Sequence, residues 1–73
     1  MTERTRVDQL QPGATFRLIA EWRVAGTDEM VPTTDELTAF EVTNDGTVVQ
    51  ISTEVGILDL EVEDYVDVVA GPS

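Results

Sequence analysis

Residues 42–62 read VTNDGTVVQISTEVGILDLEV, a pattern typical of consecutive antiparallel strands. The Asn-Asp-Gly at 44–46 predicts a hairpin turn whose glycine takes a positive φ, and the Glu-Val-Gly at 54–56 predicts a second turn. Apolar and polar residues alternate through 47–53 and 57–62, as they do on strands with one buried face. The residues expected to face the core are Val49, Ile51, Leu58, Leu60 and Val62.

The segment before the first turn, Glu36 to Thr43, fits two structures. Residues 33–36, Thr-Thr-Asp-Glu, have the form of a helix capping box, and Leu37 and Phe40 are three positions apart, as on one helix face. The β-branched and aromatic residues that follow favour a strand. Because the hairpin turn needs a strand on its N-terminal side, we expect residues 36–43 to form a strand.

A longer alternating segment lies nearer the N-terminus, from Ala14 to Ala25. Ile19 alone interrupts its alternation, so we expect one strand. A strand of this length bends strongly when it belongs to a small barrel. The residues expected to face inward are Phe16, Leu18, Ala20, Trp22 and Val24.

The chain ends are expected to be irregular. Residues 1–6 predict a loose N-terminal tail, and residues 71–73 predict a short C-terminal tail. Val7 and Leu10 are apolar anchors expected to fold over one end of the core. Pro12-Gly13 predicts a turn after them, because proline presets one backbone angle and glycine is permissive at the next.

Two connections complete the interpretation. Gly26 to Asp35 predicts a loop, within which Met30-Val31-Pro32 either cap the core or form an exposed apolar contact patch. Glu63-Asp64-Tyr65 predicts a single helical turn, followed by a short last strand from Val66 to Ala70.

Together these elements predict an all-β fold in which residues 1–73 form a single domain. We expect a small SH3-like barrel of four to five antiparallel strands with at most one short helical turn. Closure into a barrel removes exposed strand edges. The chain contains no cysteine, so disulfides do not support its modest core, and contacts with another chain are the simplest remaining support.

The C-terminal part resembles the last third of SH3-type barrels. In that family a strand leads into one helical turn ending in Tyr-Val, and Glu63-Asp64-Tyr65-Val66 followed by Asp67-Val68-Val69 has this form. The resemblance implies a barrel topology. It does not extend to binding of proline-rich peptides, because the Ala-Leu-Tyr-Asp-Tyr opening and the tryptophan after the acidic loop are both missing, and Tyr65 alone matches that groove.

The charge of the chain is strongly negative. Fifteen acidic residues face four arginines, lysine is absent, and the net charge is −11. Binding to nucleic acid requires clustered cations, and anionic membranes repel such a surface, so we expect neither partner. The composition resembles that of proteins from halophilic archaea, or from actinobacteria and their viruses. A solvated acidic surface, a mimic of the phosphate backbone and a calcium-stabilised surface all fit this charge.

The chain has few groups suited to catalysis. Without cysteine, histidine or lysine, the common nucleophile–base pairs and Schiff-base chemistry are missing. Asp59, Glu61, Glu63 and Asp64 are close in sequence, but on an alternating strand they form an exposed stripe with no cleft to raise a pKa. We therefore expect no enzyme activity, no catalytic residues, no cofactor and no metal site.

The predicted function is that of a structural or interaction module in a larger assembly, most concretely a minor capsid, decoration or connector protein of a phage or archaeal virus. Partners are expected to be other protein chains, including copies of itself, and the location intracellular or in a virion, without a signal peptide. The alternatives are an acidic nucleic-acid mimic that inhibits a DNA-binding enzyme and a halophilic cytoplasmic adaptor barrel. The candidate partner surface comprises Met30, Val31, Glu54, Asp59, Glu61, Glu63, Asp64 and Asp67.

Overall fold

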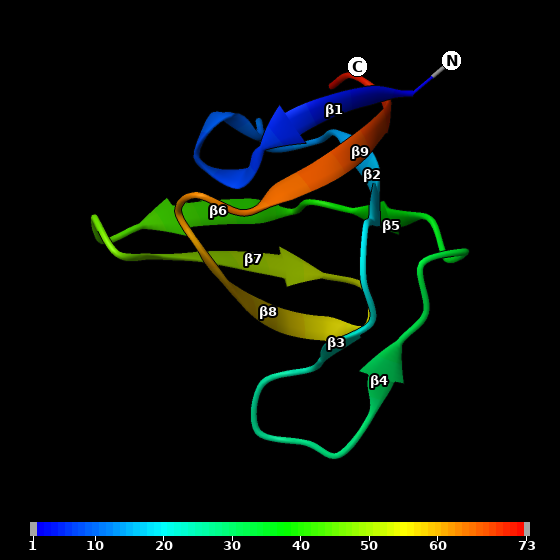
Figure 1. Ribbon diagram of the computed structural model, residues 1–73, viewed down its shortest axis with the longest axis vertical. Coiled ribbons are helices and arrows are strands. Elements are labelled where there is room, and N and C mark those ends of the chain that lie inside the picture. The colour runs from blue at the N-terminus through cyan, green and yellow to red at the C-terminus, as the bar shows by residue number, and fades with distance from the viewer. Residues whose placement is uncertain (1, 73) are drawn as a thin grey trace.

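The computed structural model describes residues 2–72, which form nine short strands and one 3-10 helix (Figure 1). The 3-10 helix spans Val7–Gln9. The strands are β1 Glu3–Arg6, β2 Thr15–Leu18, β3 Trp22–Arg23, β4 Met30–Val31, β5 Leu37–Thr38, β6 Glu41–Asn44, β7 Val48–Thr53, β8 Gly56–Glu61 and β9 Tyr65–Ala70. The all-β prediction is confirmed, with antiparallel pairing throughout.

The strands are arranged in a four-stranded sheet of order β1-β9-β2-β5, a two-stranded sheet of β3 and β4, and a three-stranded sheet of order β6-β7-β8. Strand pairing among residues 2–72 closes none of these sheets into a barrel. The expectation of four to five strands was also wrong, because residues 2–72 form nine short ones. The chain changes sheet four times, between β2 and β3, β4 and β5, β5 and β6, and β8 and β9.

The three-stranded sheet confirms the prediction from residues 42–62. β6 pairs with β7 and β7 with β8, in the register set by the two predicted turns, such as Val42 opposite Ile51. Gly46 and Gly56 both have positive φ, 98° and 129°. The alternation holds, since the side chains predicted to face the core from β7 and β8 are buried. Val62 follows β8 and packs against the core while half-buried.

Two predicted strands are each divided in the structure. The segment 14–25 becomes β2 and β3, which belong to different sheets, because the chain leaves the four-stranded sheet after Leu18. Ile19 is 45 % exposed, and Ala20, which was expected inside, is exposed too. The segment 36–43 is likewise divided into β5 and β6, with Phe40 exposed at the bend between them. Strand rather than helix is confirmed for this segment.

The predicted N-terminal tail is a strand. β1 pairs with β9 along its whole length, from Glu3 opposite Val68 to Arg6 opposite Tyr65. β9 would otherwise be a sheet edge with unpaired backbone groups, and β1 satisfies them. Gly71 and Pro72 follow the last strand, and both chain ends lie on the same side of the molecule (Figure 1). Met1 and Ser73, which the tail predictions include, lie outside the described residues.

The one helical turn is elsewhere than expected. Glu63 lies in a turn and Tyr65 is already the first residue of β9, whereas the 3-10 helix follows β1. The predicted loop 26–35 contains β4, which pairs with β3. Within residues 2–72, no helix has the length and apolar character needed to cross a membrane.

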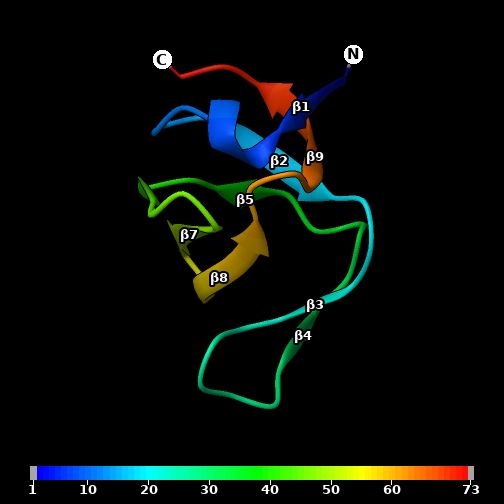
Figure 2. The same ribbon diagram turned by 60° about the vertical axis from the view of Figure 1, so that its left-hand side comes forward.

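The core lies between the four-stranded sheet and the three-stranded sheet, which Figure 2 shows as two layers. Phe16 and Leu37 enter it from the first sheet, Ile51 and Leu58 from the second, and all four are at most 1 % exposed. Val7 and Leu10 are buried as predicted, so the 3-10 helix covers one end of the core.

Candidate functional site

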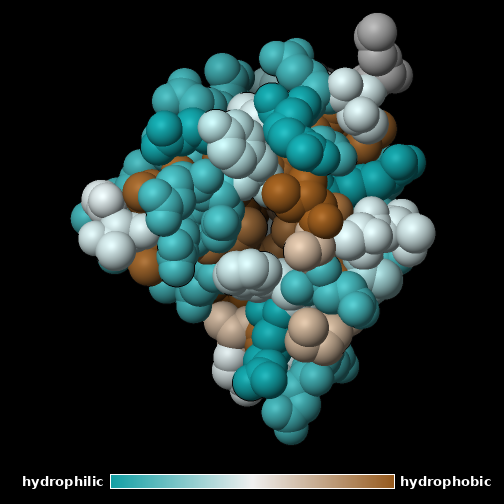
Figure 3. All heavy atoms as spheres, viewed as in Figure 1, coloured by the Kyte–Doolittle hydropathy of each residue, from teal (hydrophilic) through white to brown (hydrophobic). Residues whose placement is uncertain are grey.

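A shallow apolar pocket lies where the chain bends between β2 and β3. The turn from β8 to β9 forms its opposite wall. Its volume is about 110 Å³, and its lining consists of Leu18, Ile19, Ala20, Trp22, Leu60, Asp64 and Tyr65. Figure 3 shows hydrophobic atoms gathered around a hollow near the centre of this face of the molecule. We refer to these seven residues as the aromatic pocket.

The bend after Leu18 supplies one wall of the pocket. Leu18 is 3 % exposed and packs in the core, while the next two residues leave the sheet and stay exposed. Trp22 then re-enters the fold at β3 and is half-buried against the core. Its indole N–H donates to the carbonyl oxygen of Asp59 at 2.9 Å, which fixes the ring over the edge of β8. A buried or half-buried indole normally finds such a partner.

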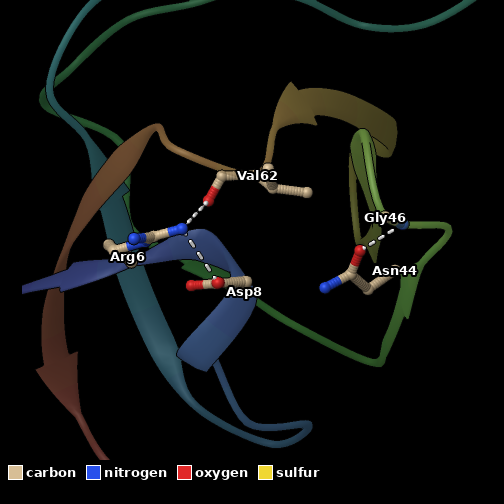
Figure 4. A network of polar contacts seen from close by, with 5 residues as sticks. All are labelled: Arg6, Asp8, Asn44, Gly46 and Val62. Carbon is tan, nitrogen blue, oxygen red and sulfur yellow. Dashed lines mark hydrogen bonds and ion pairs between the residues drawn. The ribbon is translucent and has the colours of Figure 1, made fainter.

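The opposite wall is held by the N-terminal part of the chain. Arg6 donates to the carbonyl oxygen of Val62 at 3.4 Å and to Asp8 at 3.1 Å (Figure 4). The backbone N–H of Val7 donates to the carbonyl oxygen of Asp64 at 2.9 Å. These bonds anchor the turn between β8 and β9, and thereby position Asp64 and Tyr65 at the pocket.

Apolar and aromatic groups of this pocket remain accessible. Tyr65 is 42 % exposed at the start of β9, and Ile19 is 45 % exposed across from it. Burial of such surface against another molecule is favourable, at about 25 cal/mol per Å² of apolar area. The hollow therefore leaves apolar surface open to solvent, as do Phe40 and Ile57 elsewhere on the molecule.

One carboxylate lines the pocket, and three more are on β8 or in the turn that follows it. Asp64 lines it, and its Oδ2 accepts the backbone N–H of Glu61 at 3.0 Å, which closes the turn. Asp59 and Glu61 project from the exposed face of β8, and Glu63 is exposed in the turn. The structure thus brings together four of the eight residues predicted for a partner surface.

The other four predicted residues lie apart from this site or are engaged elsewhere. Met30 is 50 % exposed on β4, but Val31 is 4 % exposed and belongs to the core, so its side chain offers no surface. A Glu54 oxygen accepts the backbone N–H of Thr38 at 2.7 Å, and Asp67 forms an ion pair with Arg4 at 3.2 Å. Within the segment Met30-Val31-Pro32, Val31 therefore packs in the core, as one interpretation predicted, whereas Met30 is exposed, as the other predicted.

Sequence reasoning missed the pocket because it placed Trp22 in the core. Two signals could have revealed it. Ile19 interrupts the alternation of the segment 14–25, which marks the bend, and Tyr65 ends the motif that resembles SH3-type barrels. The sequence does not indicate that Trp22 and Tyr65 line the same pocket, because this depends on how the two sheets pack.

Charge is divided unevenly along the chain. Residues 24–73 contain twelve of the fifteen acidic residues and none of the four arginines. Three arginines form ion pairs inside the molecule: Arg4 with Asp67, Arg6 with Asp8, and Arg17 with Glu36. The pocket carboxylates therefore meet no cation from their own strands.

The turn between β6 and β7 binds its own polar groups (Figure 4). The backbone N–H of Gly46 donates to Asn44 Oδ1 at 2.8 Å. Asp45 Oδ1 accepts the backbone N–H groups of Val48 and Thr47, and these bonds hold the pKa of that carboxyl below its ordinary value. Hydrogen bonds to the ionised form favour it. The Asp45 carboxylate therefore stabilises the turn between β6 and β7.

The pocket combines apolar and aromatic side chains with one carboxylate, that of Asp64. Within the described residues, no group of three or more acidic side chains is placed to hold a metal ion. Comparisons with protein-family models, with curated proteins and with solved structures found no match to this chain.

Proposed function

We propose that this protein is a non-enzymatic interaction module that binds another protein chain through the aromatic pocket. The observation that supports the proposal is the exposure of Tyr65 and Ile19, which line one apolar hollow together with Trp22. Aromatic residues in accessible hollows are typical of the energetically dominant positions of protein interfaces. The proposed setting is a larger assembly, most concretely a virion, for which the small size and the lysine-free composition are the support.

An SH3-like barrel is part of this proposal. Backbone hydrogen bonds outside the strand ladders support it, because they bridge segments of different sheets. The N–H of Ala25 donates to the carbonyl oxygen of Ile57 at 2.8 Å, next to β3 and on β8 respectively. The N–H of Phe40 donates to the carbonyl oxygen of Ser52 at 2.8 Å, which carries pairing into the bend between β5 and β6.

The test compares two aromatic variants. Tyr65→Ala removes part of the pocket, whereas Phe40→Ala removes an aromatic side chain of similar size that is 60 % exposed away from it. Wild-type protein and both variants are immobilised and used to capture partners from the native source. We expect a partner that is retained by wild type and by Phe40→Ala and lost with Tyr65→Ala. If all three proteins retain the partner equally, the pocket does not take part in the binding.

The second candidate, an acidic mimic of nucleic acid, has its own observation. The exposed face of the three-stranded sheet carries Glu41, Asp59 and Glu61, and residues 24–73 contain no cation to neutralise them. Its test is competition with DNA for a basic DNA-binding enzyme over a range of salt. Mimicry predicts steep loss of binding with salt and loss in the double variant Asp59→Asn/Glu61→Gln, with Tyr65→Ala unaffected.

A further inference from the structure

We infer that the occupant of the aromatic pocket is an arginine side chain, presented by a basic segment of the partner protein. This inference rests on the proposed function and names the chemistry of the partner. It combines three features of the described residues: the size of the pocket, the aromatic and carboxylate groups that line it, and the distribution of charge around it.

The size of the pocket matches one side chain. Sites for drug-sized ligands and cofactors usually measure about 300–1,000 Å³. The aromatic pocket measures about 110 Å³ and is open to solvent. It is too small to enclose a cofactor, and it suits a single long side chain that enters from a segment lying across the surface.

The lining combines aromatic rings with a negative charge. Trp22 and Tyr65 both line the pocket, and cations are attracted to the faces of such rings. Asp64 lines the same hollow, and its carboxylate keeps oxygen available beyond the one bond it accepts from Glu61. A planar guanidinium can lie flat on an aromatic ring and donate two parallel hydrogen bonds to a carboxylate, whereas a lysine ammonium is attracted to both groups only as a strongly hydrated point charge.

The surroundings extend this complementarity. Glu63 is exposed in the turn next to Asp64, and Asp59 and Glu61 project from the outer face of the adjoining strand β8. Residues 24–73 contain no arginine or lysine, and Arg6, which binds the carbonyl oxygen of Val62 in the same turn, is paired with Asp8. A basic segment lying across the pocket therefore meets carboxylates on the neighbouring strand. Opposite charges of this kind accelerate association and select the partner.

A second copy of this chain is a poor occupant. Each copy carries a net charge of −11, so two copies repel each other. Three of the four arginines are also engaged in internal ion pairs, and the fourth, Arg23, lies in the short strand β3. The partner is accordingly a different protein with an excess of positive charge.

Trp22 is the only tryptophan, so its fluorescence reports directly on the pocket. The probes are blocked peptides of one sequence, acetyl-Gly-Leu-X-Leu-Gly-amide, in which X is arginine, lysine, citrulline or glutamate. Citrulline has nearly the shape of arginine without its charge. We expect saturable binding of the arginine peptide, binding about fivefold weaker with lysine, about tenfold weaker with citrulline, and none with glutamate.

Three variants assign the binding to the pocket. Tyr65→Phe keeps the ring and is expected to bind the arginine peptide like wild type, whereas Tyr65→Ala should bind it at least fivefold more weakly. Asp64→Asn retains an oxygen for the N–H of Glu61 and should weaken binding severalfold. Phe40→Ala is the matched control and should not change it. Circular dichroism spectra confirm that each variant is folded.

The outcomes separate this inference from the proposed function. Equal binding of the arginine and citrulline peptides, or no binding of either, overturns the arginine assignment. If the captured partner still depends on Tyr65 in that case, the interaction module stands with a different occupant. If the arginine peptide binds but capture is independent of Tyr65, the pocket recognises arginine and the proposed function is wrong.

Discussion

In the three-stranded sheet every strand pairs with its neighbour in the chain, whereas in the four-stranded sheet β1 and β9 come from opposite ends of the chain. Arg4 and Asp67, which face each other there, are 63 positions apart. Short hairpins need little loop-closure entropy, while pairing of distant segments needs much more. The three-stranded sheet is therefore defined by local turns, and the four-stranded sheet exists only when the whole chain has folded.

The two sheets also differ in charge. The four-stranded sheet carries Arg4, Arg6 and Arg17, each paired with a carboxylate, whereas the three-stranded sheet carries no arginine. One of these ion pairs, between Arg4 and Asp67, joins the distant strands β1 and β9. Unneutralised carboxylates lie on the sheet that local turns already stabilise, next to the aromatic pocket. This comparison leads to four predictions, which start with the largest effect.

The two phenylalanines test where the stability resides. Phe16 is fully buried in the four-stranded sheet, so Phe16→Ala should cost about 3–5 kcal/mol, which is most of the stability expected of a domain this small. Phe40→Ala, at the bend into the three-stranded sheet, should change the free energy of unfolding by less than about 0.5 kcal/mol. Urea denaturation followed by circular dichroism measures both. A cooperative, near-wild-type transition for Phe16→Ala would contradict the assignment of the core.

Two glycines separate local turn geometry from packing between sheets. At Gly56 an added Cβ would lie 2.6 Å from Val24 Cγ1, and φ is 129°, so Gly56→Ala combines backbone strain with a clash and should cost roughly 3 kcal/mol. At Gly46, where φ is 98° and no atom lies within 4 Å, alanine should cost only about 1 kcal/mol. Thermal unfolding of the two variants compares these costs. Equal losses would show that packing against Val24 contributes nothing.

Neutralising a carboxylate should lower the stability of the protein when the residue is in the four-stranded sheet and raise it when the residue is in the three-stranded sheet. Asp67→Asn loses the ion pair with Arg4 and should destabilise by up to about 1 kcal/mol. Glu61→Gln relieves repulsion with neighbouring carboxylates and should stabilise by about 0.3 kcal/mol. Both differences, measured by urea denaturation at low ionic strength, should shrink in about 0.5 M salt through screening. The same sign for both variants would mean that the pairing with Arg4 does not matter.

The smallest effect concerns the turn between β6 and β7. Hydrogen bonds from Val48 and Thr47 lower the pKa of Asp45 from its ordinary 3.8. A carboxyl whose pKa is lower in the folded state stabilises the fold fully at pH values above its unfolded-state pKa. This stabilisation is lost as the pH falls through the folded-state pKa. Asp45→Asn should therefore be less stable than wild type above about pH 4, and the difference should shrink as the pH falls through the lowered pKa of the folded state. Urea midpoints at pH 6 and pH 2 test this, and a constant difference would exclude the carboxylate as its source.

The aromatic pocket shows the limits of sequence patterns. Asp59, Glu61, Glu63 and Asp64 were predicted together because they are neighbours along one alternating segment, and they lie together in the structure. Trp22 was expected inside, and Tyr65 was set aside as an isolated match. The pairing of Leu18 with Val66 across β2 and β9, together with the turn anchored by Arg6 and Val7, places Tyr65 at the bend that follows Leu18.

The sequence by itself determined the features that depend on neighbouring residues. These are the all-β class, the hairpin turns around Gly46 and Gly56, the buried faces of β7 and β8, and an exterior dominated by carboxylates. Alternation of apolar and polar residues and the residue preferences of turns extend over only a few positions, so they can be recognised in one sequence.

The tertiary structure alone decided where long segments break, which strands pair across the chain, and which aromatic side chains meet. β1 was read as a tail because its residues, Glu-Arg-Thr-Arg, show no alternation of apolar and polar types, and it becomes a strand because β9 offers it an unpaired edge. Backbone hydrogen bonds and packing between distant segments determine these features. Neither segment alone carries a periodic residue pattern that would predict them.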